Sequence, residues 1–223
     1  MDVSDTGVVI PALNAEKTIQ DVISGLCTFG FAREHIIVID DGSIDRTRDI
    51  AQQQRVQVIV HSHNMGKGAA LKAGFLHARK SSLKAVITID ADGQHRIEDI
   101  GLFLNNAEDY DLILGTRADT TKMPWIRCMV NRTTSLVISL LSGVRIPDVQ
   151  CGFRYCRLNI FERVRLHTSR YQTESELVYR VLGHGYRVGF VNISTIYNNE
   201  RSYIRPVIDT LRFIYMSIGF LWH

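Results

Sequence analysis

Short apolar runs alternate with amphipathic segments through the first half of the chain. Five runs are typical of buried strands: Gly7–Pro11, His35–Ile39, Val56–Val60, Ala85–Ile89 and Leu112–Leu114. Helical spacing of apolar residues marks four segments between them: Ala15–Cys27, a stretch after Asp45 through about Gln54, Gly66–Ala78 and Ile97–Ala107. This alternation predicts a Rossmann-like α/β fold, with a mostly parallel sheet flanked by helices.

The second half of the chain is less regular. Helices are expected over Trp125–Leu141, Thr173–Leu182 and Pro206–Leu221, and strands over Cys151–Cys156 and Tyr186–Val191. No repeat or linker interrupts the pattern. We therefore expect one domain over residues 1–200, followed by a C-terminal loop and amphipathic helix over residues 201–223.

Composition narrows the class of protein. The chain has 223 residues, of which 45% are hydrophobic, and its formal net charge is only +3. That is a globular composition, and the weak charge argues against a nucleic-acid binder. Four cysteines, none in a CxxC pair, are expected to be reduced thiols. A secretory leader and a membrane-spanning run of about 18 apolar residues are not expected.

Polar clusters follow three of the predicted strands, at the edge where parallel α/β sheets bind ligands. Asp90-Ala91-Asp92 is the sharpest of them, because two carboxylates after a strand can approach one cation. Hard oxygen donors favour Mg²⁺ or Mn²⁺, which would stabilise a diphosphate leaving group. The alternative is an acidic turn that caps the next helix. We favour the metal site.

Other residues at this edge have competing interpretations. Asp41 is expected to contact a ligand, whereas Asp45 is expected to cap a helix. The segment Gly66-Lys67-Gly68 is not a P-loop, and Lys67 is equally consistent with a ligand contact and with a solvated side chain. Arg117 is a candidate phosphate clamp, and His95 is expected to lie beside the acidic pair. Arg127, Arg154 and Arg201 are further phosphate-binding candidates.

These clusters, in this order, resemble the family 2 glycosyltransferases of the GT-A fold. The matching segments are VVIPALNAE (8–16), IVIDDGSIDRT (37–47), NMGKGAALKAGF (64–75), ITIDADGQH (87–95) and LILGTR (112–117). Within the family, the chain is most similar to the dolichyl-phosphate and polyprenyl-phosphate mannose or glucose synthases. That narrower similarity rests on Gln94, on QCGFRYCR (150–157) and on ERSYIRPVIDTLRF (200–213).

The resemblance implies roles for individual residues. The nucleotide sugar would contact Pro11, Ala12, Asn14, Glu16, Asp41 and Lys67. Asp90, Asp92 and Gln94 would hold Mg²⁺ or Mn²⁺, and Asp92, Gln94 and Arg117 would act in catalysis. Arg117 and Arg127 would bind the acceptor phosphate, Glu176 would lie near the sugar or metal, and Arg201 would cover the diphosphate. In place of the family's Ser-Lys pair, Ser202 is followed by Tyr203. Which basic residue replaces that lysine, Arg201 or Arg205, stays open.

A lipid phosphate is the expected acceptor. It is already anionic and needs orientation rather than a general base, and the second half of the chain shows no adjacent pair of acids to supply one. We expect a single inverting displacement. The alternative is a saccharide or protein hydroxyl as acceptor, with Glu174 or Glu176 as the base. A nucleotidyltransferase is disfavoured because PALNAEKT (11–18) replaces the Gly-rich loop, and a non-catalytic module is disfavoured by the acidic pair.

The segment 203–222 is apolar but carries Arg205 and Arg212. Such a helix could lie on a membrane surface or pack on its own domain, and a lipid substrate favours the membrane. We therefore expect a cytoplasmic enzyme, peripheral at the cytoplasmic face of a membrane, which binds that surface or a membrane partner protein. A homodimer is left open.

Overall fold

The computed structural model describes residues 2–117, 125–196, 213, 216 and 217. The strands are β1 (Thr6–Ala12), β2 (Ile36–Asp40), β3 (Gln57–Val60), β4 (Ala85–Thr88), β5 (Leu112–Arg117), β6 (Arg154–Arg157) and β7 (Val188–Ile193). The helices are α1 (Ile19–Phe29), α2 (Thr47–Gln53), α3 (Lys67–Ala78), α4 (Ile100–Asn106), α5 (Trp125–Ser142) and α6 (Gln172–Gly183). Short 3₁₀ turns lie at η1 (Arg33–His35), η2 (Ile97–Asp99) and η3 (Leu158–Glu162).

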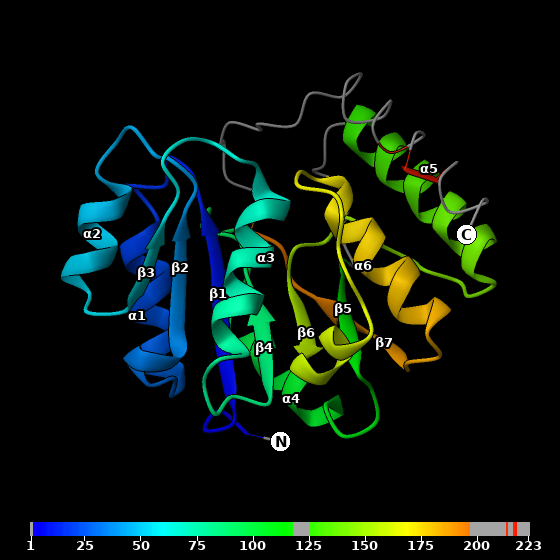
Figure 1. Cartoon of the computed structure of the whole chain (residues 1–223), viewed down its shortest axis with the longest axis horizontal. Coiled ribbons are helices and arrows are strands. Elements are labelled where there is room, and N and C mark those ends of the chain that lie inside the picture. Colours follow the sequence, from blue (N-terminus) through cyan, green and yellow to red (C-terminus); the bar gives the residue numbers. More distant parts are fainter. Residues whose placement is uncertain (1, 118–124, 197–212, 214–215, 218–223) are drawn as a thin grey trace.

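The seven strands form one sheet in the order β3-β2-β1-β4-β6-β5-β7. All neighbouring strands are parallel except β6, which runs antiparallel to both β4 and β5. Figure 1 shows the sheet crossing the molecule, with α3 and α6 on the near face. The predicted fold class, a mostly parallel α/β sheet flanked by helices, is confirmed.

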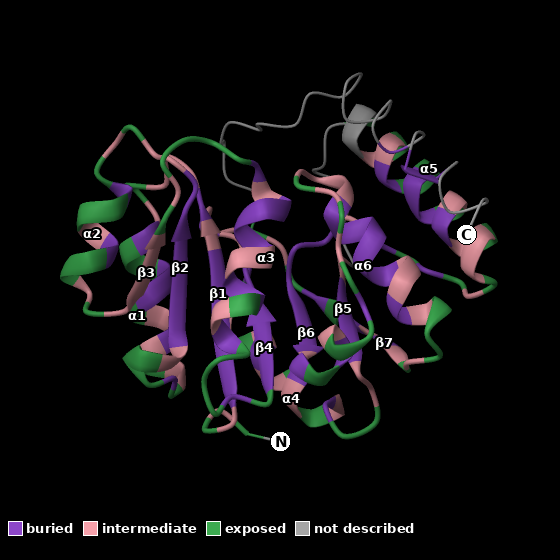
Figure 2. Cartoon of the chain, viewed as in Figure 1, coloured by how far each residue is buried: buried purple, intermediate pink, exposed green. Residues whose placement is uncertain are grey.

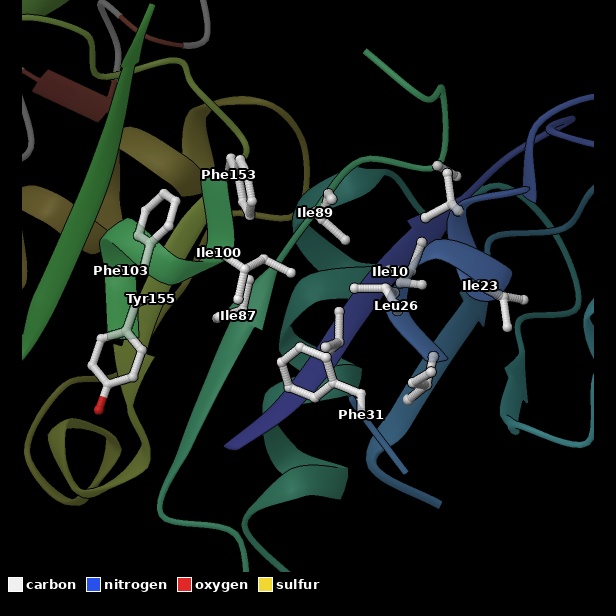
Figure 3. Packing of buried hydrophobic residues seen from close by; sticks show 14 of the residues in the cluster. Ile10, Ile23, Leu26, Phe31, Ile87, Ile89, Ile100, Phe103, Phe153 and Tyr155 are labelled. Carbon is white, nitrogen blue, oxygen red and sulfur yellow. The ribbon is translucent and has the colours of Figure 1, made fainter. Parts of the chain in front are cut away.

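Alternate residues of the central strands point to opposite faces of the sheet, where two apolar cores form. On one face, Val8 and Ile10 of β1 pack with Ile23 and Leu26 of α1, a packing that Figure 3 shows in part. On the other face, Val9 packs among residues of α3 and α6. Figure 2 shows that β1, β2 and β4 are buried along nearly their whole length. Because both faces of these strands are covered, each strand is a continuous apolar run in the sequence.

Helix α3 approaches the sheet at a glycine. A Cβ atom on Gly74 would lie 2.4 Å from a methyl group of Val9 and 2.9 Å from one of Ile39. Any larger side chain would therefore push α3 away from β1 and β2. This close approach fixes the start of α3, and with it Lys67, near the carboxyl end of the sheet.

The antiparallel direction of β6 matters for the site. Thr88, the last residue of β4, pairs with Arg154, the first residue of β6. The Thr88 hydroxyl donates a hydrogen bond of 2.7 Å to the Gly152 carbonyl. The segment before β6 therefore lies beside the segment after β4, and Gly152 comes next to Asp90.

Several predicted boundaries differ from the structure. Helix α1 begins at Ile19 rather than at residue 15, because residues 15–18 form a turn. Strand β5 continues through Arg117, since it pairs along its full length with β7. Of the predicted terminal helix over residues 206–221, the structure describes Phe213, Met216 and Ser217, which are helical and buried. Phe213 and Met216 join the same core as α3 and α6, so these two residues pack on the chain's own domain, which was the less favoured of the two alternatives for this helix.

No helix in the described part of the chain is long and apolar enough to cross a membrane. All four cysteines, Cys27, Cys128, Cys151 and Cys156, are free thiols, as expected.

Candidate active site

Asp90 and Asp92 lie immediately beyond the carboxyl end of β4, where the sequence placed them. The Asp92 carboxylate accepts a 3.0 Å hydrogen bond from the Gln94 backbone N–H, which closes the turn. The carbonyl of the intervening Ala91 accepts a 2.6 Å bond from the Thr18 hydroxyl. The acidic turn is thus tied to the loop that follows β1.

A buried cation occupies one side of this turn. The Lys67 Nζ atom lies 2.7 Å from Asp90 Oδ1 and 3.1 Å from Glu174 Oε1, and little of its side chain is exposed. Lys67 is therefore not a solvated side chain, and its contact with a ligand stays a prediction. Glu174 lies in the first turn of α6, so the first turns of α3 and α6 and the end of β4 meet here.

Gly152 leaves the space in which this ion pair forms. A Cβ atom at position 152 would lie 2.5 Å from Asp90 Oδ2, 2.8 Å from Asp90 Oδ1 and 2.8 Å from Lys67 Nζ. No side chain other than hydrogen fits at that distance. The role of Gly152 was missed from the sequence, although the residue stands inside the quoted segment 150–157.

The electrostatics of the two carboxylates differ. Burial opposes ionisation of Asp90, but the charges of Lys67 and His95 outweigh it and hold the pKa of Asp90 well below its usual range. The pKa of Asp92 is raised by burial and by the negative charge of Asp90. Burial opposes the charge of Lys67, but Asp90 and Glu174 outweigh it and raise the pKa of Lys67, so Lys67 stays charged.

His95 lies where it was expected, beside the acidic pair. Its Nε2 atom is 3.7 Å from Asp90 Oδ2, and its ring packs against Phe153 with centroids 5.1 Å apart. Phe153 follows Gly152, so both residues of that segment support the same carboxylate.

The donor set fits a divalent cation. Two carboxylates and the amide of Gln94 offer hard oxygen atoms, the ligands that Mg²⁺ and Mn²⁺ prefer. The repulsion that raises the pKa of Asp92 is one that a divalent cation would relieve. Within the described residues, no group of three or more His, Cys, Asp or Glu side chains could hold a metal ion. The assignment of Asp90, Asp92 and Gln94 as metal ligands stays a prediction.

The loops after β1 and β2 are joined by hydrogen bonds. The backbone N–H of Asn14 donates to the Ser43 hydroxyl at 3.0 Å, and Asn14 Oδ1 accepts from the Ile44 N–H at 3.0 Å. The Glu16 N–H donates to Asp45 Oδ2 at 3.1 Å, and Glu16 Oε2 accepts from the Arg46 N–H at 3.2 Å. The two loops form one wall beside the carboxyl ends of β1 and β2.

Asn14 has a positive φ of 51°, which asparagine tolerates better than most residues. Pro11 and Ala12 form the end of β1 under this wall, and Ala12 is buried. Asp45 also accepts a 2.9 Å bond from the Thr47 N–H at the start of α2, but the N-cap residue is Arg46; Asp45 was predicted to be the cap and lies one residue before it.

Asp41 holds the segment that leads into α3. Its carboxylate accepts hydrogen bonds from the N–H groups of Met65 at 3.0 Å and Gly66 at 2.8 Å. His61 Nδ1 lies 2.7 Å from Asp41 Oδ1. Asp41 is buried and fixes the approach to Lys67, and its contact with a nucleotide stays a prediction.

Arg117 lies at the carboxyl end of β5 and pairs with Asp148. Its Nε and Nη2 atoms donate to the two Asp148 carboxylate oxygens at 2.7 and 3.0 Å. The arginine outweighs the effect of burial and lowers the pKa of Asp148. This partner was missed because nothing in the sequence links positions 31 residues apart. Phosphate binding by Arg117 stays a prediction.

Arg154 does not face a ligand, so its selection as a phosphate-binding candidate was wrong. It is buried, and its guanidinium donates to the carbonyls of Cys151, Glu174 and Val149 at 2.8, 2.7 and 2.6 Å. These bonds fix the backbone around Gly152 and the first turn of α6. Arg154 is thus a structural residue under the site.

Glu176 is not brought to the acidic turn. Its carboxylate accepts hydrogen bonds from the N–H groups of His167 and Thr168, from the Thr168 hydroxyl and from Arg180 Nε at 2.7 Å. These donors outweigh burial and lower the pKa of Glu176. The structure therefore corrects the expected position: Glu174 contacts the site, and Glu176 holds the loop before α6.

Two predicted phosphate ligands cannot be placed. Arg127 belongs to α5, but its side chain lies outside the described residues, and Arg201 lies outside them altogether. Their roles stay predictions.

Comparison with known proteins identifies the family. The family model described as Glycosyl transferase family 2 matches residues 7–165, which include the acidic turn, Lys67 and Gly152. The chain belongs to this family. It is a glycosyltransferase.

Two relatives and one solved structure refine this result. The chain is 29% identical to the polyprenol monophosphomannose synthase of Mycolicibacterium smegmatis, over 85% of the chain and 76% of that protein. It is 30% identical to the UDP-N-acetylglucosamine–dolichyl-phosphate N-acetylglucosaminyltransferase of Methanococcus voltae, over 85% of the chain and 84% of that protein. Glucosyl-3-phosphoglycerate synthase of Mycobacterium tuberculosis, with Mn²⁺ and UDP-glucose, aligns with a TM-score of 0.75 at 19% identity. That alignment covers 96% of this chain and 79% of the synthase, and it shows the shared GT-A fold.

Proposed function

We propose that this glycosyltransferase moves a hexose from a nucleotide sugar, GDP-mannose or UDP-glucose, to a polyprenyl or dolichyl phosphate, with inversion and with the help of Mg²⁺ or Mn²⁺. The observation that carries the proposal is the Asp90–Asp92–Gln94 turn at the carboxyl end of β4. Relatives that make polyprenol- and dolichol-linked sugars support the lipid acceptor.

The donor would lie between the acidic turn and the wall formed by the loops after β1 and β2. Pro11, Ala12, Asn14 and Glu16 belong to that wall, and Asp41, directly after β2, ties it to the segment before α3. When bound, the cation would neutralise charge on the departing nucleoside diphosphate. Asp90, Asp92 and Gln94 would hold it there.

The acceptor phosphate is already a nucleophile, so the chain has to orient it and exclude water. Arg117 lies at the same edge of the sheet as the acidic turn, and its ion pair with Asp148 fixes its orientation. Arg127 and Arg201 are the further arginines that we assign to the phosphates. Glu174 is a poor general base, because Lys67 holds its carboxylate in an ion pair.

Helix α5 offers a surface for a lipid substrate. Trp125, Met129, Leu136 and Leu140 are 70%, 57%, 60% and 74% exposed. Their spacing of four, seven and four residues puts all four on one side of the helix. Exposed Arg132 lies between them, and the segment 125–142 has no acidic residue. An apolar, basic surface of this kind suits the interface of an anionic membrane.

This surface supports a peripheral location at the cytoplasmic face of a membrane, either on the lipid itself or beside a membrane partner protein. Both would bring the lipid phosphate to the edge of the sheet at which α5 begins. Phe213 and Met216 of the C-terminal segment 201–223 are buried in the chain's own core, so membrane contact is proposed only for other residues of that segment.

A transfer assay with two panels tests the proposal. Labelled GDP-mannose, UDP-glucose and UDP-N-acetylglucosamine would each be incubated with the protein, Mg²⁺ or Mn²⁺ and one of three acceptors. The acceptors are a short polyprenyl phosphate, the matching polyprenol and a soluble saccharide. We expect label in the organic phase with one donor and only with the phosphate. Transfer to the polyprenol or the saccharide instead would overturn the acceptor assignment.

A further inference from the structure

The Asp90 carboxylate has a cation of the chain's own beside it. Lys67 Nζ lies 2.7 Å from Asp90 Oδ1, and only 17% of the lysine side chain is exposed. Glu174 binds the same ammonium at 3.1 Å, so Lys67 bridges the proposed metal ligand and an acid on another helix. A divalent cation that binds Asp90 must share this space with Lys67.

The position of Lys67 is fixed from both sides. Lys67 is the first residue of α3, and the N–H groups of Met65 and Gly66 just before it are held by Asp41. The N–H of Ala69 in the same turn donates to the Ser169 carbonyl at 2.9 Å. The backbone of Lys67 thus has little freedom to withdraw, and only the flexible side chain can move.

Glu174 is fixed as well. Its carbonyl accepts a 2.7 Å bond from Arg154, which is itself buried. An ammonium displaced from Asp90 therefore keeps one carboxylate within reach. Gly152, which leaves no room for a Cβ, closes the remaining side of the pair.

The Lys67 ammonium and a divalent cation at Asp90 would repel each other. Two positive charges within a few ångströms repel strongly where water is scarce. A divalent ion alone would meet the Lys67 ammonium on Asp90, whereas a divalent ion that arrives with a diphosphate brings compensating negative charge. We propose that Lys67 is a built-in competitor for Asp90, which makes binding of the divalent cation depend on the nucleoside diphosphate, and that Glu174 receives the displaced ammonium.

This inference rests on the proposed function, because it assumes the metal site at Asp90 and Asp92. Its consequence is a thermodynamic coupling: nucleotide and cation should each raise the affinity for the other by the same factor. Removing the Lys67 charge should shrink that factor by raising the affinity of the nucleotide-free protein for the cation.

Binding of Mn²⁺, followed by the loss of the free-ion signal in electron paramagnetic resonance, tests the inference without an activity assay. Wild-type protein would be titrated alone, with UDP and with GDP. Lys67→Met should bind Mn²⁺ in the absence of nucleotide roughly tenfold more tightly than the wild type, since a nearby positive charge is lost. Glu174→Gln should bind Mn²⁺ more weakly than the wild type. Asp90 is then the only one of the two carboxylates that pairs with the Lys67 ammonium, so the ammonium competes more strongly with the cation.

Two variants serve as controls. Lys67→Arg keeps the charge and should keep the wild-type coupling. Lys72→Met removes a charge from the same helix, five residues further on, and should leave Mn²⁺ affinity close to that of the wild type. Thermal unfolding would show that each variant is folded, and Glu174→Gln carries the test if Lys67→Met does not fold.

The outcomes separate the two claims. If wild-type protein binds Mn²⁺ with UDP or GDP but Lys67→Met is no tighter without nucleotide, the competitor role is wrong and the metal site stands. An equal gain in Mn²⁺ affinity without nucleotide in Lys67→Met and Lys72→Met would also overturn the competitor role. The loss of any positive charge from α3 would then be enough to raise the affinity. If wild-type protein binds no Mn²⁺ with either nucleotide, the proposed metal dependence fails, and the inference fails with it.

Discussion

Gly152→Ala is the substitution for which the structure gives the sharpest expectation. The new Cβ atom would stand 2.5 Å from Asp90 Oδ2, while ordinary contact begins at 3.4 Å, so the carboxylate must retreat by about 0.9 Å. The backbone of residue 152 cannot yield easily, because its carbonyl accepts the Thr88 hydroxyl at 2.7 Å. The strain therefore falls on Asp90 and Lys67.

The magnitude follows from the displacement of Asp90, a proposed metal ligand. The retreat also weakens the ion pair: if the separation of Asp90 and Lys67 grows from 2.7 Å to about 3.6 Å, their attraction weakens by about 1.5 kcal/mol at an effective dielectric constant of about 20. Transfer does not depend on that attraction, since Lys67 is proposed to leave Asp90 when the cation binds. A displacement of about 1 Å in a catalytic group can cost about 100-fold in rate, and we therefore expect kcat/KM for sugar transfer to fall by about 10- to 100-fold.

The assay is transfer at saturating Mg²⁺, with urea unfolding measured alongside. Gly101→Ala is the matched control, because a Cβ at that position in α4 meets no atom within 4 Å. It should leave transfer unchanged and raise the free energy of unfolding by about 0.5–1 kcal/mol, as for other helical glycines. Wild-type transfer by Gly152→Ala would refute the geometry that we assign to the Asp90–Lys67 pair.

Three further variants have defined outcomes. Glu176→Gln should lower the free energy of unfolding by about 1–3 kcal/mol in urea at pH 7. The pKa of Glu176 is lowered in the folded state, so its stabilisation is present above its ordinary pKa and is lost as the pH falls through the folded value. Asp148→Asn should cost on the order of 3 kcal/mol in the same assay, because it breaks a nearly buried ion pair with Arg117. Leu136→Ser with Leu140→Ser should reduce sedimentation with anionic vesicles severalfold and leave thermal unfolding unchanged, since both side chains are exposed.

Matched controls accompany these substitutions. Glu162→Gln alters an exposed carboxylate and should change stability by less than about 0.5 kcal/mol. Leu76→Ser with Leu102→Ser removes two exposed leucines from other helices and should leave vesicle binding unchanged. Equal losses of vesicle binding in the two double variants would contradict a specific role for α5. A pH-independent deficit in Glu176→Gln would show that its charge is not what stabilises the fold.

The alternation of strands and helices could be predicted because burial on both faces leaves continuous apolar runs. The direction of β6 could not. An apolar run carries no sign of whether its strand is parallel or antiparallel, and β6 is short. Its direction is nonetheless what brings Gly152 to Asp90, so one contact of the site was beyond the reach of the pattern.

The acidic turn was predictable because Asp90 and Asp92 directly follow a buried strand. The choice between Glu174 and Glu176 was not, since both lie in α6 and positions two apart face different sides of a helix. Only the packed structure shows that Glu174 meets Lys67, whereas Glu176 meets the loop 167–168. The ion pair of Arg117 with Asp148 was hidden for a similar reason, because it joins two distant segments.

The most direct test of the central claim compares the wild type with Asp92→Ala in the formation of labelled polyprenyl phosphate sugar. Asp109→Asn, an exposed acid outside the site, serves as the control. We predict that lipid-linked label appears with the wild type and with Asp109→Asn, that a chelator abolishes it, and that Asp92→Ala forms none while unfolding at a temperature near that of the wild type. Equal product from a folded Asp92→Ala, or product that persists in the chelator, would contradict the account.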